Sequence, residues 1–126
     1  MNFLLRPESF CIHRLPPDRQ LPLDRLGAAS WYSITRTNDE LSVIAPSDID
    51  LDPGKHEAGW SCLQVEGTLD FGMIGVISGI SKTLADAQVS LFAVSTYNTD
   101  YFLVRTTDID KAVRALTAAG HCVRSG

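Results

Sequence analysis

The chain has 126 residues, enough for one compact domain or two very small ones, which excludes a large multidomain protein. Apolar residues make up 44% of the chain and charged residues 21%, which is typical of a folded protein and excludes a disordered one. The formal net charge of −4, from 15 acidic and 11 basic residues, provides no basic surface for phosphates, so nucleic acid is not an expected partner.

The cysteines and the apolar runs bear on the cellular compartment. Cys11, Cys62 and Cys122 are odd in number and show no CxxC spacing, whereas small secreted domains usually carry paired cysteines. Each lies in an apolar run and is expected in the core. The start of the chain lacks the features of a signal peptide, and no stretch approaches the roughly 20 apolar residues of a membrane span. We therefore expect a cytoplasmic protein with no membrane contact.

All six prolines lie in the N-terminal half, where the apolar runs are short, and this favours strands over long helices. The sequence predicts a helical turn within residues 21–27 and strands at 10–15, 31–36 and 41–45, the last two forming a hairpin. A polar stretch from Ser47 to Gly59 then predicts a boundary between residues 1–58 and 59–126.

The second half predicts two helices among four strands. The strands are expected at 60–65, 89–94, 101–105 and 121–124. Thr68 or Asp70 caps the first helix. Its predicted buried face consists of residues at nearly helical spacing: Phe71, Ile74, Ile77, Leu84 and Ala87. A second helix begins after Thr107 or Asp108 and ends at Gly120; its buried face is Ile109, Ala112, Val113, Leu116 and Ala119.

This βαββαβ order is that of a ferredoxin-like unit, in which both helices cover one face of the sheet. The first half reads as a shortened version of the same unit. We therefore expect an α+β fold of two ferredoxin-like units side by side, the first one abbreviated. The uncovered sheet face of such a unit is free to meet a second copy, so a homodimer is expected.

Several segments resemble those of a known family. They are Trp60-x-Cys62-Leu63-x-Val65-Glu66-Gly67-x-Leu69-Asp70-Phe71, Ile74-Gly75-Val76-Ile77 and Ser95-Thr96-Tyr97-Asn98-Thr99-Asp100-Tyr101, together with residues 33–43 of the first half. With these segments the chain resembles the tandem ACT-domain proteins related to aspartate kinase regulatory domains and to the CASTOR arginine sensors. The resemblance extends over most of the chain.

The resemblance implies a regulatory protein that binds a free amino acid between its two ACT units and catalyses no reaction. It places the α-carboxylate and α-amino groups of the ligand at a backbone edge formed by Ser42 and Val43, and a glycine contact at Ile74 and Gly75. The turn around the ligand is implied to contain Thr96, Tyr97 and Asp100. Ser78 stands where the arginine sensors have an acidic residue, so arginine is not identified as the ligand.

The residues themselves are compatible with such a site. Backbone amides at the start of the helix near Asp70 suit a carboxylate, and Asp100 suits an ammonium group. Gly72 and Gly75 would let a small ligand approach the backbone. Other roles remain open at this stage: a turn former for Asp100, a helix cap for Asp70, and close packing of helix on sheet for Gly75.

The sequence indicates neither a metal site nor a catalytic site. His13, His56 and His121 show no HxxxH or Cys/His spacing typical of metal ligands. His121 and Cys122 are adjacent in a predicted strand and would point to opposite faces, so they do not form a nucleophile and base pair. We therefore expect neither an enzyme nor a bound cofactor. The alternative to an amino-acid sensor is a structural dimerisation module without a ligand.

Overall fold

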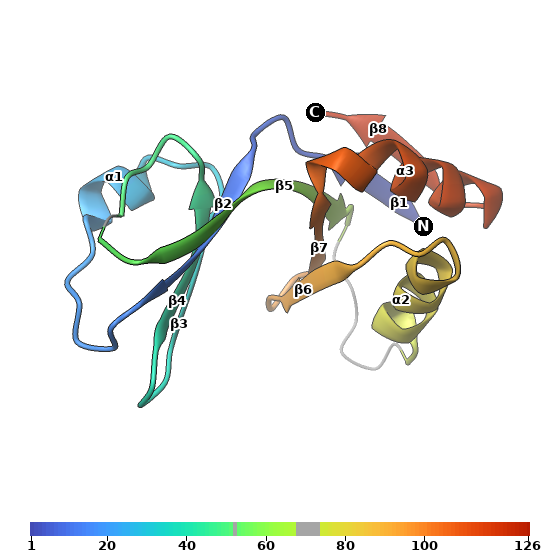
Figure 1. The fold of residues 1–126 in the computed structure, drawn as a ribbon. Helices are drawn as coiled ribbons and strands as arrows, with labels where there is room; N and C mark the ends of the chain where they lie inside the picture. Colours follow the sequence, from blue (N-terminus) through green and yellow to red (C-terminus); the bar gives the residue numbers. More distant parts are fainter. Residues whose placement is uncertain (52, 68–73) are drawn as a thin grey trace. The chain divides into compact units, whose positions relative to one another are not determined.

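The computed structural model describes residues 1–51, 53–67 and 74–126. They form an α+β fold of two units, as expected (Figure 1). Unit 1 comprises Met1–Pro7 and Ser61–Gly126, and unit 2 comprises Glu8–Trp60. One long strand, β5 (Lys55–Val65), runs through both: its first residues belong to unit 2 and its last residues to unit 1.

Unit 1 has the predicted βαββαβ order. After β5 come α2 (Val76–Asp86), β6 (Leu91–Ser95), β7 (Asp100–Arg105), a short 3-10 turn at Thr106–Asp108, α3 (Ile109–Ala118) and β8 (Cys122–Ser125). β6 and β7 pair antiparallel, as their composition predicts. The expected ferredoxin-like unit is therefore present (Figure 1).

The first strand of the chain completes the sheet of unit 1. β1 (Asn2–Leu5) pairs antiparallel with β5 and parallel with β8, which places it between them in the order β6-β7-β5-β1-β8. Phe3 is fully buried and its ring meets that of Phe102 edge-on, with 6.5 Å between the ring centres. The predicted boundary after residue 58 assigned residues 1–7 to the first half, whereas burial of this apolar strand joins them to the second.

Both helices of unit 1 pack on one face of its sheet. The core combines residues of α2 (Ile80, Leu84) and α3 (Ala112, Leu116) with alternating strand residues (Phe3, Leu63, Val65, Phe102, Val104) and with Val89, which precedes β6. The predicted face of α3 is thus confirmed at Ala112 and Leu116. The predicted face of α2 is wrong at Ile74 and Ile77, which are 98% and 40% exposed.

The helix start explains this error. Because α2 begins only at Val76, Ile74 precedes the helix and Ile77 lies in its first turn, so the contacts with the core come from the later turns. Ala87 is half-buried against that core. Phe71, and the expected caps Thr68 and Asp70, lie outside the described residues.

Unit 2 is the shorter unit. It contains β2 (Phe10–Leu15), α1 (Leu23–Gly27), β3 (Ser33–Arg36), β4 (Leu41–Pro46) and the first part of β5, in the sheet order β3-β4-β2-β5. The predicted hairpin of β3 and β4 is confirmed. The described residues between β4 and β5 form no helix, whereas unit 1 has α3 at the corresponding place. Its core comprises Leu15, Leu26, Leu41, Val43, Ala45 and Leu51.

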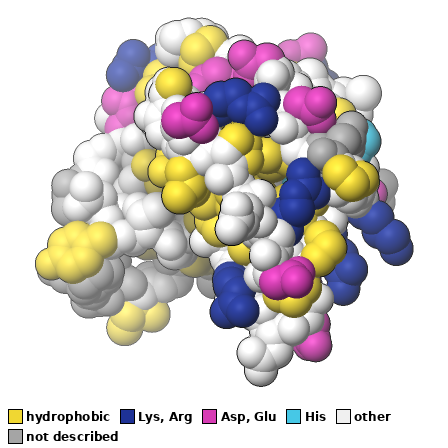
Figure 2. Space-filling model, turned by 90° about the vertical axis from the view of Figure 1, so that its left-hand side faces the viewer, with side chains coloured by type: hydrophobic (Ala, Val, Ile, Leu, Met, Phe, Trp, Pro, Cys, Tyr) yellow, Lys and Arg dark blue, Asp and Glu magenta, His cyan; other side chains and the backbone are white. Residues whose placement is uncertain are grey.

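The surface mixes charge and apolar groups. On the face that Figure 2 presents, basic and acidic side chains alternate around exposed apolar ones, so this face has no continuous basic surface. Cys11 and Cys62 are buried, but Cys122 is exposed on β8, a strand whose residues are mostly exposed, so its predicted burial is wrong. Among the described helices, none has the length and apolarity needed to span a membrane.

Candidate functional site

The predicted turn Ser95 to Asp100 joins β6 to β7. The Thr96 backbone N–H donates to the carbonyl of Thr99 at 2.9 Å, and the Thr96 hydroxyl donates to the same carbonyl at 3.1 Å. Hydroxyl groups that bond the local backbone are typical of tight turns. Tyr97 lies at the tip and is 80% exposed. Thr96 thus closes the turn, and the Tyr97 ring is presented to solvent.

Asp100 is a strand residue, not a loop residue. It begins β7, pairs with Ser95 of β6 and is 8% exposed. The Ser95 hydroxyl donates to its Oδ1 at 2.7 Å. Because alternate residues of a strand share a face, Asp100 lies on the face that bears Phe102 and Val104 of the core. The structure therefore places a buried carboxylate at the end of the core-facing side of β7.

The same turn is attached to the end of β5. The buried Thr99 hydroxyl donates to the Val65 carbonyl at 2.8 Å. The next residue, Glu66, accepts a bond from Arg124 Nε at 2.6 Å and donates its backbone N–H to Asn2 at 2.8 Å. Hydrogen bonds thus join the end of β5 to the β6–β7 turn, to β1 and to β8.

The start of α2 lacks the usual side-chain cap. Gly75 is the N-cap, with φ of 82° in the left-handed region, and within residues 1–51, 53–67 and 74–126 no side-chain cap hydrogen bond is found at this helix start. The first turn also has no acidic residue, so its partial positive charge is not offset there. A Cβ at Gly75 would meet no atom of the described residues within 4 Å. The described residues therefore give no sign of close packing at this position, and the positive φ favours a glycine there.

Ser42 and Val43 lie in β4 of unit 2. This strand pairs with β2 on one side and with β3 on the other. The two residues therefore do not form a sheet edge, which is a correction of the predicted backbone edge: strand β3 occupies that edge instead. Val43 is fully buried in the core of unit 2, and Ser42 is half-buried.

The predicted site residues fall into three groups. Thr96, Tyr97 and Asp100 come together at the β6–β7 turn of unit 1. Ile74 and Gly75 stand just before α2 in the same unit, and Ser42 and Val43 belong to unit 2. Asp70 and Gly72 lie outside the described residues.

Sequence reasoning missed a pair of histidines. His13 and His56 are register partners in β2 and β5, and their ring centres are 5.9 Å apart. They line a pocket of about 220 Å³ that also contains Cys11, Asp48 and Asp50. No group of three or more potential metal ligands is found in the part of the chain that the structure describes. The two histidines meet because β2 pairs with β5. Their spacing along the sequence does not reveal this pairing.

His121, which directly precedes β8 and lies against the Met1 amino group, has a shifted pKa. Burial, and secondarily the positive Met1 amino group, lower its pKa from the ordinary value of 6.5. The Met1 amino group lies 2.8 Å from His121 Nδ1, and the Phe3 ring meets the imidazole edge-on. A neutral imidazole, accepting the bond at Nδ1, suits this arrangement.

Comparisons with known proteins agree with this architecture. The model of the ACT domain family matches residues 55–118. The crystal structure of protein Atu0741 from Agobacterium tumefaciens is 31% identical, with a TM-score of 0.88 over 99% of this chain and 92% of that one. The regulatory subunit of aspartate kinase from Thermus thermophilus is 11% identical, with a TM-score of 0.62 over 89% of this chain and 93% of that one.

A human relative extends the comparison. The protein CASTOR3P from Homo sapiens is 26% identical over an aligned length of 101 residues, and the match covers 70% of this chain and 62% of that protein. The match therefore spans less than two thirds of the human protein.

Proposed function

Because the chain belongs to the ACT domain family, we propose that it is a non-enzymatic regulatory protein that binds a free amino acid. The similarity of its fold to the regulatory subunit of aspartate kinase supports a regulatory role. The strand order β3-β4-β2-β5 of unit 2 supports a further part of the proposal, that this unit is a second, abbreviated ACT unit. Three free cysteines are consistent with action in the cytoplasm.

The observation that carries the proposal is the buried carboxylate of Asp100 in unit 1. A free amino acid is a zwitterion, so its site needs a partner for the ammonium group and a partner for the carboxylate. Asp100, 8% exposed and oriented by Ser95, suits the ammonium group. The first-turn amides of α2, for which the described residues provide no side-chain cap, suit the carboxylate.

The proposal is tested by measuring thermal shifts of the full chain with each of the twenty amino acids, followed by calorimetry on those that stabilise it. Asp100→Asn keeps the acceptor for the Ser95 hydroxyl but removes the charge, and is expected to weaken binding by about tenfold or more. Asp39→Asn, at an exposed position of unit 2, is the matched control and should bind normally. The absence of any shift at millimolar concentrations would contradict the proposal.

A structural dimerisation module is the second candidate, and an edge strand favours it. Within the described residues β6 pairs with β7 alone, and its Phe92 is 40% exposed. An edge strand with an exposed aromatic residue is a ready surface for a second copy. Analytical ultracentrifugation separates the two candidates. A dimer that responds to an amino acid supports the sensor, and a dimer indifferent to all twenty and to Asp100→Asn supports the structural module.

A further inference from the structure

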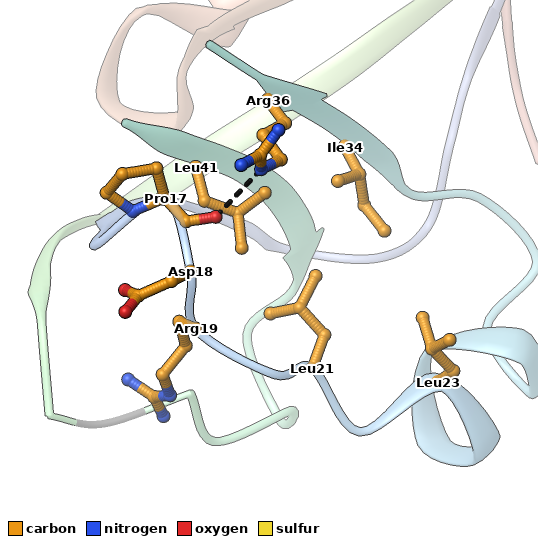
Figure 3. A pocket seen from close by; sticks show the side chains of 8 residues that line it. All are labelled: Pro17, Asp18, Arg19, Leu21, Leu23, Ile34, Arg36 and Leu41. Atoms are coloured by element: carbon orange, nitrogen blue, oxygen red, sulfur yellow. Dashed lines mark hydrogen bonds between the residues drawn. The ribbon is translucent and has the colours of Figure 1, made fainter. Parts of the chain in front are cut away.

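The β3–β4 hairpin of unit 2 has two faces of different character. Figure 3 shows Ile34, Arg36 and Leu41 on one of them, where they line a hollow of about 470 Å³. Leu41 also belongs to the core of unit 2, so this is the face that the core covers. Because successive residues of a strand point to opposite faces, Thr35 and Ser42 lie on the other face.

A row of four polar side chains crosses the sheet of unit 2 on this other face. Thr35 is the register partner of Ser42, Ser42 of Arg14, and Arg14 of Lys55. Thr35, Arg14 and Lys55 are exposed, and Ser42 is half-buried. Since neighbouring strands lie about 4.8 Å apart, the row is roughly 14 Å long. We call these four residues the cationic row.

Two positive charges lie directly opposite each other in the cationic row. Like charges at such cross-strand positions are destabilising. Within the described residues the Lys55 side chain forms no hydrogen bond or ion pair. The Arg14 side chain forms one bond there, from Nη2 to the backbone carbonyl of Asp39 at 3.4 Å, and this neutral group does not offset the charge. Charges kept at a cost in stability are typical of functional surfaces.

The nearest acidic residues do not neutralise these two charges. Glu57 lies two residues from Lys55 in β5 and shares its face, but within the described part of the chain it forms no ion pair with Lys55 or Arg14. Asp39 contacts Arg14 through its backbone and not through its carboxylate. The positive charge of the cationic row is therefore available to an external group.

The two hydroxyl groups add neutral donors to the same row. In residues 1–51, 53–67 and 74–126 neither the Thr35 nor the Ser42 hydroxyl forms a hydrogen bond. Each hydroxyl can donate to a carboxylate or carbonyl oxygen, while the guanidinium and ammonium groups have donors and no acceptor. Donors thus extend over the whole row, which favours a negatively charged partner rich in acceptors.

We infer that the cationic row binds an acidic segment of a partner protein. One carboxylate of the segment pairs in two-pronged fashion with the Arg14 guanidinium, and a second pairs with the Lys55 ammonium group. The Ser42 and Thr35 hydroxyls donate to further oxygens of the segment. A single exposed ion pair contributes little, so a segment is required, and roughly 14 Å corresponds to about four extended residues. This contact goes beyond the binding of an amino acid and gives a regulatory protein a surface for its target.

The test is fluorescence anisotropy of fluorescein-labelled hexaglutamate with the full chain and no amino acid. Arg14→Gln and Lys55→Gln are each expected to weaken binding about three- to fivefold, and Lys55→Glu further. Arg25→Gln is the matched control, since Arg25 is an exposed residue of α1, which packs on the opposite face through Leu26. It should bind as the unaltered chain does. Raising the ionic strength from about 0.1 M to about 1 M shortens the Debye length from about 10 Å to about 3 Å and should abolish binding.

The melting temperature without peptide is an independent readout. Lys55→Glu places an opposite charge across from Arg14, so it is expected to raise the melting temperature by about 1–5 °C while it weakens peptide binding. Arg25→Gln should leave the melting temperature unchanged. These melting curves also verify that each variant folds. A lower melting temperature for Lys55→Glu would show that the two positive charges are already compensated in the chain, which overturns the inference.

Three binding results would also overturn the inference. The first is no change in anisotropy at millimolar hexaglutamate. The second is binding that Arg14→Gln and Lys55→Gln leave unchanged, because the peptide then lies elsewhere. The third is tighter binding of hexathymidylate than of hexaglutamate through the same two cations, which would indicate a nucleic acid as the partner. None of these results bears on the proposed function, because the assay contains no amino acid.

Discussion

Ser95 and Asp100 face each other across the antiparallel pair of β6 and β7, and the Ser95 hydroxyl donates a 2.7 Å hydrogen bond to Oδ1 of Asp100. Asp100 is only 8% exposed, so this bond replaces part of the hydration that its carboxylate loses on folding. The role of a simple turn former does not require such burial. The pair makes the end of the β6–β7 hairpin chemically distinctive within unit 1.

Ser95→Ala is expected to lower the free energy of unfolding by about 1–2 kcal/mol, because it leaves a buried carboxylate oxygen without its hydroxyl donor. Urea denaturation measures this change. Ser90→Ala is the control: Ser90 is exposed and forms no hydrogen bond through its side chain with the described residues. Equal stability of the two variants would show that the hydrogen bond contributes nothing.

Gly75→Ala is expected to lower the free energy of unfolding, measured by urea denaturation, by about 1–2 kcal/mol, since a residue with a Cβ is strained at φ of 82°. The new methyl group would meet no atom of the described residues within 4 Å, so the expected loss comes from the strained backbone. Gly75→Asn should recover part of it, because asparagine tolerates the left-handed region. Gly27→Ala, at a glycine with open space and without positive φ, serves as the control and should be neutral or slightly stabilising. A similar result for Gly75 and Gly27 would contradict the argument.

His121 predicts a pH dependence of stability. Burial lowers its pKa below 6.5 in the folded state, so the unfolded state binds more protons in the interval between the folded value and 6.5. Stability therefore rises with pH through that interval, is fully present above 6.5, and is lost as the pH falls below it. Melting temperatures measured between pH 5 and pH 8 should rise with pH, and His121→Gln should reduce the slope. An unchanged slope in this variant would assign the effect to other groups.

Phe3→Ala is expected to destabilise unit 1 by about 3–5 kcal/mol, the usual cost of removing a buried phenylalanine. It tests directly whether the first strand belongs to the core of the second half. Asn2→Ala, at the exposed neighbouring position of β1, should change the stability little. Denaturation with guanidinium measures both. A loss below about 1 kcal/mol for Phe3→Ala would mean that β1 is peripheral to this core.

The local elements were largely predictable from the sequence. The alternation of apolar residues in 10–15 corresponds to β2. The turn residues between 36 and 41 correspond to the β3–β4 hairpin. The succession of strand and helix patterns after Trp60 corresponds to the βαββαβ order of unit 1. The turn Ser95 to Asp100 was also evident from its composition. These features depend on residues close to one another in the chain, whose spacing is visible in the sequence.

The tertiary structure alone decided which strands become neighbours and which helical residues become buried. Phe3 joins the core of unit 1 through pairing with residues some sixty positions away in β5, and β3 covers the edge of β4 at which Ser42 and Val43 were expected to be free. Ile74 and Ile77 share the helical spacing of buried residues, yet α2 starts too late for them to reach the core. Pairing of distant strands and the point at which a helix begins depend on the total apolar surface that the chain can bury, which a local pattern does not specify.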